Sequence, residues 1–562
     1  MNIAILSSFT ARPIEAALRE ACKEADISCG IYLGGYNQYA QEILNPQSGL
    51  YSHTPDMVIF FVDTRALLGD LFFVPYDMSD EVRKDFIEEK CNELITLVGH
   101  IKQNSSAKIL FHNFEIPIYS PLGILENKKA FGFFEAIEML NSKLRQHYKN
   151  DPRVFLFDYE RFCARVGKER VFDYKMYYLG DMKLNPQCVP MLIKEYLGYI
   201  KPLISRTKKC LVLDCDNTLW GGVIGEDGIE SIRLGPTPEG RSFLEFQKYL
   251  LSMFNRGIVL ALNSKNNHDD VMRVLREHPH MVLKEEHFAA TRINWDDKVA
   301  NMRALSDELN LGIDSFVFVD DERINRDMMR QMLPEVGIVE LPDDPALYIK
   351  AITELDDFNT LALTDEDRAR GKMYAVDRQR KEMQHAATDL NEYLRNLQTV
   401  VIIEPVNSIL IPRVAQLTQK TNQFNMTTRR YTQEQIAELA NRPDCLVASL
   451  CARDRFGDNG VVGIAIVEQE RDRWRIDAFL LSCRIIGRRI EEALLAHIVD
   501  YAKKAGAKTL VGEFIPTKKN MPAKGFYERN GFARAGSVED AEIWEYDLAN
   551  TYPYPDLIKV IV

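Results

Sequence analysis

The stretch KKCLVLDCDNTLWGG, residues 208–222, carries two aspartates, Asp214 and Asp216, directly after a short apolar run. The apolar residues 211–213 predict a buried strand, so both aspartates lie at its carboxyl end and face the same side if strand alternation continues. Ligands of open parallel sheets bind outside the carboxyl ends of the strands. Two neighbouring carboxylates repel each other unless a cation or a proton lies between them, and oxygen ligands favour Mg²⁺. The stretch therefore predicts a magnesium site at one edge of a parallel sheet.

Two further strand-like runs in the same segment also end in polar residues. GIVLALNS ends in Ser264, and SFVFVDD ends in Asp320 and Asp321. Between them, INWDDKVANM supplies Lys298 at the start of a predicted helix. Carboxyl ends of parallel strands meet at one edge of a sheet, so we expect these carboxylates, the hydroxyl and the ammonium to converge.

The order D-x-D-x-T, S, K and DD resembles the haloacid-dehalogenase (HAD) phosphotransferase superfamily. The resemblance implies that Asp214 is the nucleophile that takes a phosphoryl group. Asp216 would protonate the leaving oxygen and later activate water. Ser264 and Lys298 would hold phosphoryl oxygens and offset the developing charge. The dehalogenases of this superfamily lack the second aspartate, so its presence favours phosphoryl chemistry.

The same resemblance implies the magnesium ligands. They would be Asp214, the main-chain carbonyl of Asp216, and Asp320, with Asp321 as an outer partner. The other interpretation is a degenerate site that is kept for folding.

A closer resemblance, to the FkbH-like proteins of HAD subfamily IIIC, rests on LDCDNTLWGGVIGEDG, NSKNN and FVDDERINRD. The flanking stretches GGYNQYAQEILNPQSGLY and LSCRIIGRRIEEALL also resemble that family. The resemblance implies a polyketide-biosynthesis enzyme that dephosphorylates a phosphoglyceryl donor, such as 1,3-bisphosphoglycerate, and transfers the glyceryl group to an acyl carrier protein thiol. Two alternatives remain: a phosphatase of a small metabolite with a separate acyltransferase domain, and a non-catalytic carrier-protein docking factor.

Cys215 lies between the two aspartates of the first motif. The family resemblance implies that its thiol holds the glyceryl group before transfer. However, strand alternation directs the side chain away from Asp214 and Asp216, and nearby carboxylates raise the pKa of a thiol. A buried packing cysteine is therefore an equal alternative.

The C-terminal stretches CRIIGRRIEEALLAHI and NMPAKGFYERNGF resemble the GNAT acyltransferases. In that family an R-x-x-G-x-G/A loop opens a helix whose free N–H groups hold a pyrophosphate. Arg484 and Gly487 match this loop, but Arg489 replaces its last small residue, which puts ordinary coenzyme A binding in doubt. Arg488 and its neighbours would instead meet a phosphopantetheine arm or an acidic carrier protein. Tyr527 is either a general acid or a structural tyrosine.

The N-terminal segment loosely resembles the SGNH hydrolases. ILSSFT places Ser7 or Ser8 at the position of the nucleophile, and FHNFE offers His112 and Asn113. In LGDMKLNPQ, Leu184 occupies the position of the catalytic histidine, so no base activates the serine. We therefore predict a non-catalytic domain.

The polar loop GGYNQY is a candidate substrate or partner surface within this segment, through Tyr36, Asn37 and Gln38. The other interpretation of this loop is a turn that is followed by the start of a helix.

Alternating strand-like and helical patterns predict a multidomain α/β protein. The expected domains are an SGNH- or flavodoxin-like domain at 1–204, a Rossmann-like HAD core at 205–345, a helical linker at 346–396 and a GNAT-like α+β domain at 397–562. Thr364 is the expected N-cap of a linker helix.

The bulk composition excludes several classes of protein. A net charge of -12 over 562 residues argues against nucleic-acid binding. The ten cysteines show no metal-type spacing, which is typical of reduced thiols in a cytosol. No run of about 20 apolar residues and no signal-like N-terminus occurs, so we expect a cytoplasmic protein with no membrane span.

Overall fold

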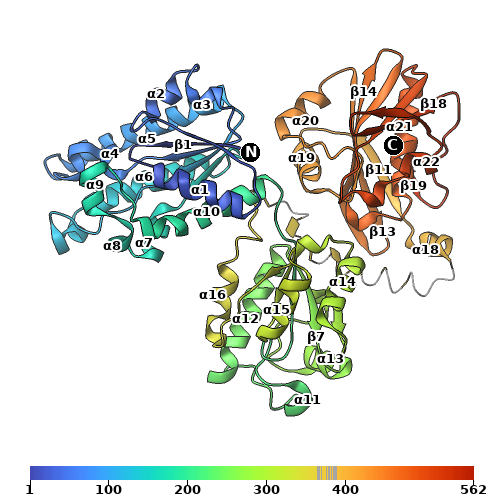
Figure 1. The fold of residues 1–562 in the computed structure, drawn as a ribbon, viewed down its shortest axis with the longest axis horizontal. Coiled ribbons are helices and arrows are strands. Elements are labelled where there is room, and N and C mark those ends of the chain that lie inside the picture. Colours follow the sequence, from blue (N-terminus) through green and yellow to red (C-terminus); the bar gives the residue numbers. More distant parts are fainter. Residues whose placement is uncertain are drawn as a thin grey trace. The chain divides into compact units, whose positions relative to one another are not determined.

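In the described part of the chain, the computed structural model contains three separate sheets, and the colours of Figure 1 give their order along the sequence. The chain divides into two compact units, Met1–Ile200 and Lys201–Val562. The described residues are 1–363, 367–368, 370–371, 373–374, 376–377, 380, 383 and 389–562. The predicted boundaries near 204, 345 and 397 fall between the sheets and stay predictions.

The first unit is built on a five-stranded sheet in the order β2-β1-β3-β4-β5. Every neighbouring pair is parallel, as the alternation of strands and helices predicts. The strands are β1 Asn2–Ser7, β2 Gly30–Leu33, β3 Met57–Phe61, β4 Lys108–His112 and β5 Val154–Phe157.

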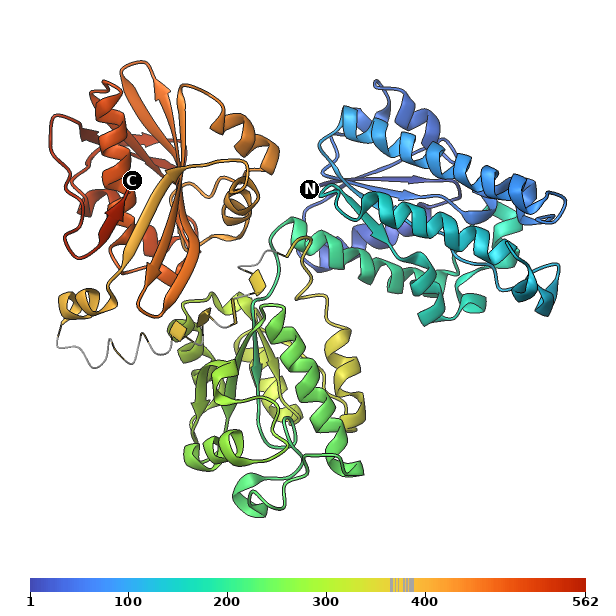
Figure 2. The same cartoon turned by 180° about the vertical axis from the view of Figure 1, so that it is seen from behind.

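Helices cover both faces of this first sheet. Figures 1 and 2 show α5 and α6 on one face and α1 and α10 on the other. Apolar side chains of α5 and α6 share one core with alternate residues of β1, β3 and β4. The helices are α1 Arg12–Glu24, α2 Tyr39–Leu44, α3 Gly49–Ser52, α4 Thr64–Leu68, α5 Asp80–Asn104, α6 Phe133–Tyr148, α7 Tyr159–Val166, α8 Lys168–Val171, α9 Tyr174–Gly180 and α10 Val189–Leu203.

The second sheet is also fully parallel, in the order β10-β9-β6-β7-β8. Its strands are β6 Cys210–Leu213, β7 Val259–Ser264, β8 Phe288–Ile293, β9 Phe316–Val319 and β10 Gly337–Ile338. Its helices are α11 Ile224–Asp227, α12 Pro238–Asn255, α13 His268–Glu277, α14 Lys298–Leu309, α15 Arg323–Met332 and α16 Tyr348–Thr353.

Alternation along β6 divides the core of this domain into two layers. Leu211 and Leu213 pack with α12, α13 and α16, whereas Cys210 and Val212 pack with α14 and α15. Both faces of the sheet are therefore buried, which is why its strands read as continuous apolar runs rather than alternating ones.

The third sheet has nine strands and is mostly antiparallel, with the order β17-β18-β16-β15-β14-β13-β11-β19 and with β12 paired to β15. Its strands are β11 Val400–Pro405, β12 Phe424–Asn425, β13 Cys445–Asp454, β14 Gly457–Glu470, β15 Arg473–Leu481, β16 Thr509–Phe514, β17 Ala533–Val538, β18 Ala541–Asp547 and β19 Lys559–Ile561. Its helices are α18 Leu390–Leu397, α19 Ile411–Lys420, α20 Gln433–Ala440, α21 Ile490–Lys504 and α22 Phe526–Arg529.

Helices also cover both faces of the third sheet. Helix α21 packs on one face and α19 with α20 on the other. Among the described helices, none combines the length and the apolar composition that a membrane-spanning helix needs. The expected N-cap at Thr364 lies outside the described residues, whereas α18 begins after Asp389, whose side chain accepts a hydrogen bond from the Glu392 N–H group.

Candidate active site

The site lies where three adjacent strands of the second sheet end. Leu213 of β6 pairs in register with Leu262 of β7 and Val319 of β9. The residue after each paired position therefore lies at the same edge, and the Asp214 N–H donates to the Val319 carbonyl over 2.9 Å. This register explains why motifs more than 100 residues apart in sequence converge, as the strand-end patterns predicted.

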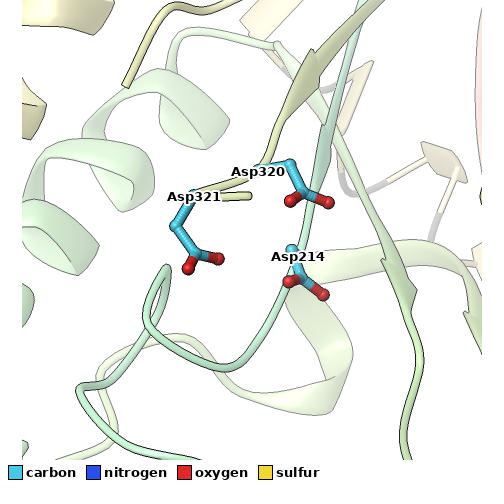
Figure 3. A group of neighbouring side chains, drawn as sticks. All are labelled: Asp214, Asp320 and Asp321. Carbon is cyan, nitrogen blue, oxygen red and sulfur yellow. The ribbon is translucent and has the colours of Figure 1, made fainter. Parts of the chain in front are cut away.

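Three carboxylates converge at this edge (Figure 3). One oxygen each of Asp214, Asp320 and Asp321 lies within 4.8 Å of the other two. Asp214 and Asp320 are buried and Asp321 is half-buried. A buried cluster of hard oxygen donors at this spacing is a donor set that Mg²⁺ binds.

Lys298 partly balances the charge of this cluster. It opens α14, where the Asp297 side chain caps the first N–H groups, and its carbonyl accepts a hydrogen bond from Asn263 Nδ2 over 2.8 Å. Its Nζ lies 3.0 Å from Asp214 Oδ1 and 2.6 Å from Asp320 Oδ2. Burial disfavours the ammonium, but the two carboxylates outweigh burial and raise the pKa of Lys298. The predicted phosphoryl-binding lysine thus contacts two aspartates directly.

Asp320 is held by several donors besides Lys298. Its Oδ1 accepts from the Glu322 N–H over 2.9 Å and from Asn325 Nδ2 over 3.1 Å. The Arg326 guanidinium donates to the Asp320 carbonyl over 2.7 Å. Asn325 and Arg326 lie in the stretch FVDDERINRD, after the two aspartates, where no strand-end pattern indicates their role.

Asp216 lies beside the cluster and is fixed by hydrogen bonds. Its Oδ1 accepts from Trp220 Nε1 over 2.9 Å and from the Ile224 N–H over 3.1 Å, and its Oδ2 accepts from Asn266 Nδ2 over 2.9 Å. The chain leaves the strand after Leu213, so these bonds, rather than strand alternation, orient the carboxylate. The carboxylates that could hold a metal are those of Asp214, Asp320 and Asp321, and the ligand role of the Asp216 main-chain carbonyl stays a prediction.

The aspartates of the site carry more negative charge than one lysine offsets. Burial, followed by Asp214 and Asp320, raises the pKa of Asp321 to about 7. Burial also raises the pKa of Asp216 and of Asp320, with Asp214 adding to both shifts. A bound divalent cation would relieve this repulsion, so the residues present fit Mg²⁺.

Ser264, at the end of β7, reaches the site as predicted from the strand end. Its side chain is buried, and its Oγ accepts from Asn266 Nδ2 over 3.2 Å. Asn266 therefore joins Ser264 to Asp216. This asparagine belongs to the motif NSKNN, but the motif alone does not indicate its role. Its two hydrogen bonds show that it links Ser264 to Asp216.

Cys215 packs in the apolar core, and its thiol also interacts with Ser264 and with the charges of Asp214 and Asp216. It is fully buried and packs in the layer that holds Leu211, Leu213 and Trp220. Burial, followed by the charge of Asp214, raises the pKa of its thiol well above the usual value. These properties favour the packing alternative over the acyl-carrying one, because the thiolate is the nucleophilic form.

The arginines of the GNAT-like loop form internal ion pairs. Arg488 is buried and lies 3.0 Å from Asp377 and 3.3 Å from Asp454. Arg489, in a left-handed conformation with φ 60°, lies 2.7 Å from Glu492 of α21. Both guanidinium groups therefore already have acidic partners. These ion pairs argue against the predicted contact of the two arginines with a phosphopantetheine arm or a carrier protein. They also argue against a coenzyme A pyrophosphate bound by these two guanidinium groups.

Arg484 and Gly487, the other two residues of the predicted GNAT-like loop, precede helix α21. Gly487 has φ +82°, a conformation that glycine adopts without strain, and lies just before α21. The main chain of Arg484 lies in the short 3₁₀ turn Cys483–Ile485, and its side chain is outside the described part of the structure.

Tyr527 is buried within the C-terminal core. Its side chain is 1% exposed, and its hydroxyl has no hydrogen-bond partner among the described residues. A Cβ atom on Gly512 of β16 would lie 2.5 Å from the Tyr527 ring, so the glycine makes room for it. Burial raises the pKa of this hydroxyl. This placement argues against the predicted general acid and favours the structural alternative.

The N-terminal residues that resemble a hydrolase site do not form a catalytic pair with His112. Ser7 Oγ donates to the Phe9 carbonyl over 2.7 Å, and Ser8 Oγ accepts from the Asp63 N–H over 2.8 Å. His112 is buried with its Nε2 2.8 Å from Tyr196 Oη, and burial lowers its pKa.

The remaining N-terminal candidates also make internal contacts. Asn113 Nδ2 donates to Asp158 over 2.8 Å, and Leu184 is buried. In the loop GGYNQY, Tyr36 is exposed and Asn37 has φ 49°, and Gln38 directly precedes α2, so the turn and helix start occur as described in the second interpretation.

Comparison with known proteins gives matches for all three parts of the chain. Residues 2–201 match the family model "FkbH, N-terminal domain", and residues 412–532 match the "Acetyltransferase (GNAT) family". No curated protein matches the chain by sequence.

A solved structure that contains a phosphatase domain is also similar to this chain. It is the N-terminal part of BF1531 from Bacteroides fragilis, which contains a phosphatase domain and is complexed with Mg. The two sequences are 28% identical, the match covers 65% of this chain and 95% of that chain, and the TM-score is 0.60.

The ribosomal-protein-S18-alanine N-acetyltransferase of Escherichia coli is 18% identical over 26% of this chain and 94% of its own, with a TM-score of 0.22. The two family models and the phosphatase-containing structure confirm the FkbH-like resemblance, and the three sheets confirm the multidomain α/β fold predicted from the sequence. The chain is therefore similar to an FkbH N-terminal domain over residues 2–201, to the GNAT family over residues 412–532, and to a structure that contains a phosphatase domain.

Proposed function

We propose that the chain is a Mg²⁺-dependent enzyme that dephosphorylates a phosphoglyceryl donor and transfers the glyceryl group to the thiol of an acyl carrier protein. The observation that carries the phosphoryl part is the convergence of Asp214, Asp320 and Asp321 beside Asp216 and Lys298. The likeness to a magnesium-bound phosphatase domain supports it. The glyceryl donor and the carrier protein rest on the FkbH-type resemblance.

The proposed chemistry is a phosphoryl transfer in two steps, in which one aspartate is the nucleophile and the other transfers protons. Asp214 Oδ attacks the phosphorus of the donor's phosphate ester, and the bond from phosphorus to the ester oxygen breaks while protonated Asp216 supplies a proton to that oxygen, so the acyl phosphate of the donor stays intact for the later transfer. Water then attacks the aspartyl phosphate, and Asp216 takes its proton, so inorganic phosphate leaves and both carboxyl groups return to their first state. Lys298 and Ser264 orient the phosphoryl oxygens.

Magnesium would be held by Asp214 and Asp320, with Asp321 beside them. When bound, it supplies positive charge that balances the carboxylates and the incoming phosphate. Trp220 Nε1 and the Ile224 N–H both donate to the Asp216 carboxylate and orient it beside the cluster.

The glyceryl group goes to the thiol of the carrier protein in this proposal and does not pass through Cys215. An acyl phosphate reacts with a thiolate at its carbonyl carbon, so that a thioester forms and phosphate leaves. The buried position of Cys215 and its raised pKa give no reason to place the acyl group on it.

A metabolite phosphatase with a separate acyltransferase domain is the second candidate, because the phosphatase-like and GNAT-like parts match different proteins. Phosphate release from the donor, with and without carrier protein, separates the two. The transfer proposal expects an added glyceryl mass on phosphopantetheinylated carrier protein after incubation with enzyme, Mg²⁺ and the bisphosphorylated donor.

Asp214→Asn is the decisive variant, and Asp269→Asn is its control, because Asp269 is an exposed aspartate on α13 of the same domain. We expect Asp214→Asn to abolish phosphate release and Asp269→Asn to retain it. Phosphate release without any glyceryl adduct on the carrier protein would favour the metabolite phosphatase. Release unaffected by Asp214→Asn would contradict the active site itself and favour a docking factor.

A further inference from the structure

The N-terminal domain contains an open pocket that none of the predicted site residues explains. It opens beside α4, α8 and α9 of the first unit. Much of its wall consists of apolar and aromatic side chains, among them Phe72, Pro117, Ile118, Val171, Phe172 and Tyr174. Pockets with apolar walls and a few fixed polar groups are typical of sites for small organic molecules.

Arg65 of α4 supplies a buried cation in this wall. Its side chain is 7% exposed, and its guanidinium carbon lies 4.5 Å from the ring centre of Phe172, 4.9 Å from that of Phe72 and 5.1 Å from that of Tyr177. Its Nη1 is buried and has no hydrogen-bond partner in the described part of the chain. A buried donor without a partner is unfavourable, and an acceptor on a ligand would remove that cost.

The other cations of the pocket already have acidic partners. Lys183 Nζ lies 2.7 Å from Glu115 and also pairs with Asp63, and Lys168 lies 2.5 Å from Glu160. The guanidinium is therefore the one charged donor among the described lining residues that forms no ion pair. Because Glu115 and Asp63 lie close by, a ligand with two negative charges would meet repulsion that one with a single charge largely avoids.

Exposed apolar side chains lie at the rim. Ile118 is 45% exposed, Tyr119 is 49% exposed and Tyr174 is 40% exposed, and all three line the pocket. Tyr119 Oη also lies 3.5 Å from Arg65 Nη2, at the entrance to the buried donor. An apolar rim around one buried cation fits an organic anion better than an inorganic one, because the body of the ligand would cover the rim.

We propose that this pocket binds a small organic acid with a single carboxylate. The carboxylate accepts from Arg65 Nη1, since the planar guanidinium fork matches a carboxylate, and the apolar body lies against Phe172 and Ile118. This site is separate from the phosphoryl-transfer residues, and the proposal does not depend on the function assigned to them.

The test titrates the full-length protein, without Mg²⁺, with benzoate, butyrate, benzamide and phenyl phosphate, followed by calorimetry and saturation-transfer NMR. We expect at least one of the two carboxylates to bind saturably at one site, with benzamide about tenfold weaker or more than benzoate. If neither carboxylate binds saturably, or if benzamide matches benzoate, the proposal is wrong. If phenyl phosphate bound more tightly than benzoate at the Arg65 site, the proposal that the pocket takes a ligand with one negative charge would be wrong.

Two variants, compared with one control, test whether the carboxylates bind in this pocket or elsewhere on the protein. Arg65→Met keeps an apolar stem among the rings and removes the donor, and we expect a loss of carboxylate affinity of about tenfold or more. Arg19→Met, at an exposed arginine of α1 paired with Glu15, is the matched control and should bind as the wild type does. Ile118→Trp fills the entrance without touching the cation, so it tests the pocket even if Arg65→Met fails to fold; unchanged binding in it would also overturn the proposal.

Discussion

Lys298 holds together two carboxylates that would otherwise repel each other, and this balance is the central feature of the site at the scale of single residues. Lys298→Met should lower the free energy of unfolding by about 3–5 kcal/mol in the presence of EDTA, because it leaves Asp214 and Asp320 buried without their cation. Denaturant titration followed by circular dichroism measures this change. Phosphate release should fall about a hundredfold or more.

Added Mg²⁺ should recover part of that lost stability, since a divalent ion replaces the missing charge. Lys248→Met, at an exposed position of the same domain on α12, serves as the control and should change neither quantity appreciably. If the Lys298 variant were as stable as the wild type in EDTA, the ion pairs would not contribute as argued.

Two buried tyrosine hydroxyls offer an opposed pair of predictions. Tyr527→Phe should raise the free energy of unfolding of its domain by about 1 kcal/mol, because the lost hydroxyl has no hydrogen-bond partner among the described residues. Tyr196→Phe should lower that of the first unit by about 1 kcal/mol, because the hydroxyl bonds His112. Calorimetric scans measure both. A loss of stability in Tyr527→Phe would mean that its hydroxyl has a partner after all.

Single residues also show what the sequence could predict. Asp214, Asp320 and Ser264 follow apolar runs, so the pattern itself indicates that they meet at one sheet edge. The burial of Tyr527 depends on its contact with Gly512, and no local pattern encodes that contact.

At the scale of elements, helix α21 carries a carboxyl group whose titration should be visible in the stability of its domain. Glu491 lies in the first turn, its Oε2 is buried without a described partner, and burial raises its pKa from 4.5 to about 7. The folded state therefore binds this proton more tightly than the unfolded state, so stability falls as pH rises from about 4.5 to about 7. One such group contributes a slope of at most about 1.4 kcal/mol per pH unit.

Glu491→Gln should flatten that part of the pH profile and make the domain more stable than the wild type at pH 8. Glu528→Gln, on the exposed side of α22, is the matched control. Melting temperatures across the pH range measure the effect, and parallel profiles for wild type and Glu491→Gln would show that burial does not shift this group.

Elements differ in how far their patterns reveal them. Strands β6, β7 and β9 were predicted because their apolar runs are bounded by polar residues, which is typical of parallel strands buried on both faces. Strand β8, FAATRI, was not predicted, because alanine, threonine and arginine weaken its pattern. Its place at the edge of the sheet comes from pairing with β7.

At the scale of the whole molecule, two compact units imply that the chain does not unfold in one step. The units are Met1–Ile200 and Lys201–Val562, and the carboxylate cluster belongs to the second. A ligand stabilises only the cooperative unit that binds it. The phosphoryl-transfer site and the N-terminal pocket should therefore act on different transitions of the same chain.

Differential scanning calorimetry of the full-length protein should therefore show more than one transition, and Mg²⁺ should shift one that belongs to the second unit. At free Mg²⁺ about a hundredfold above its dissociation constant, the gain is about 2.7 kcal/mol. Asp320→Asn should remove most of this gain, because it removes a charge from the cluster, whereas the transition of the first unit should stay in place in both proteins. A magnesium shift of equal size in Asp320→Asn, or one confined to the first unit, would show that the ion binds outside the carboxylate cluster and that the phosphoryl-transfer proposal lacks its metal.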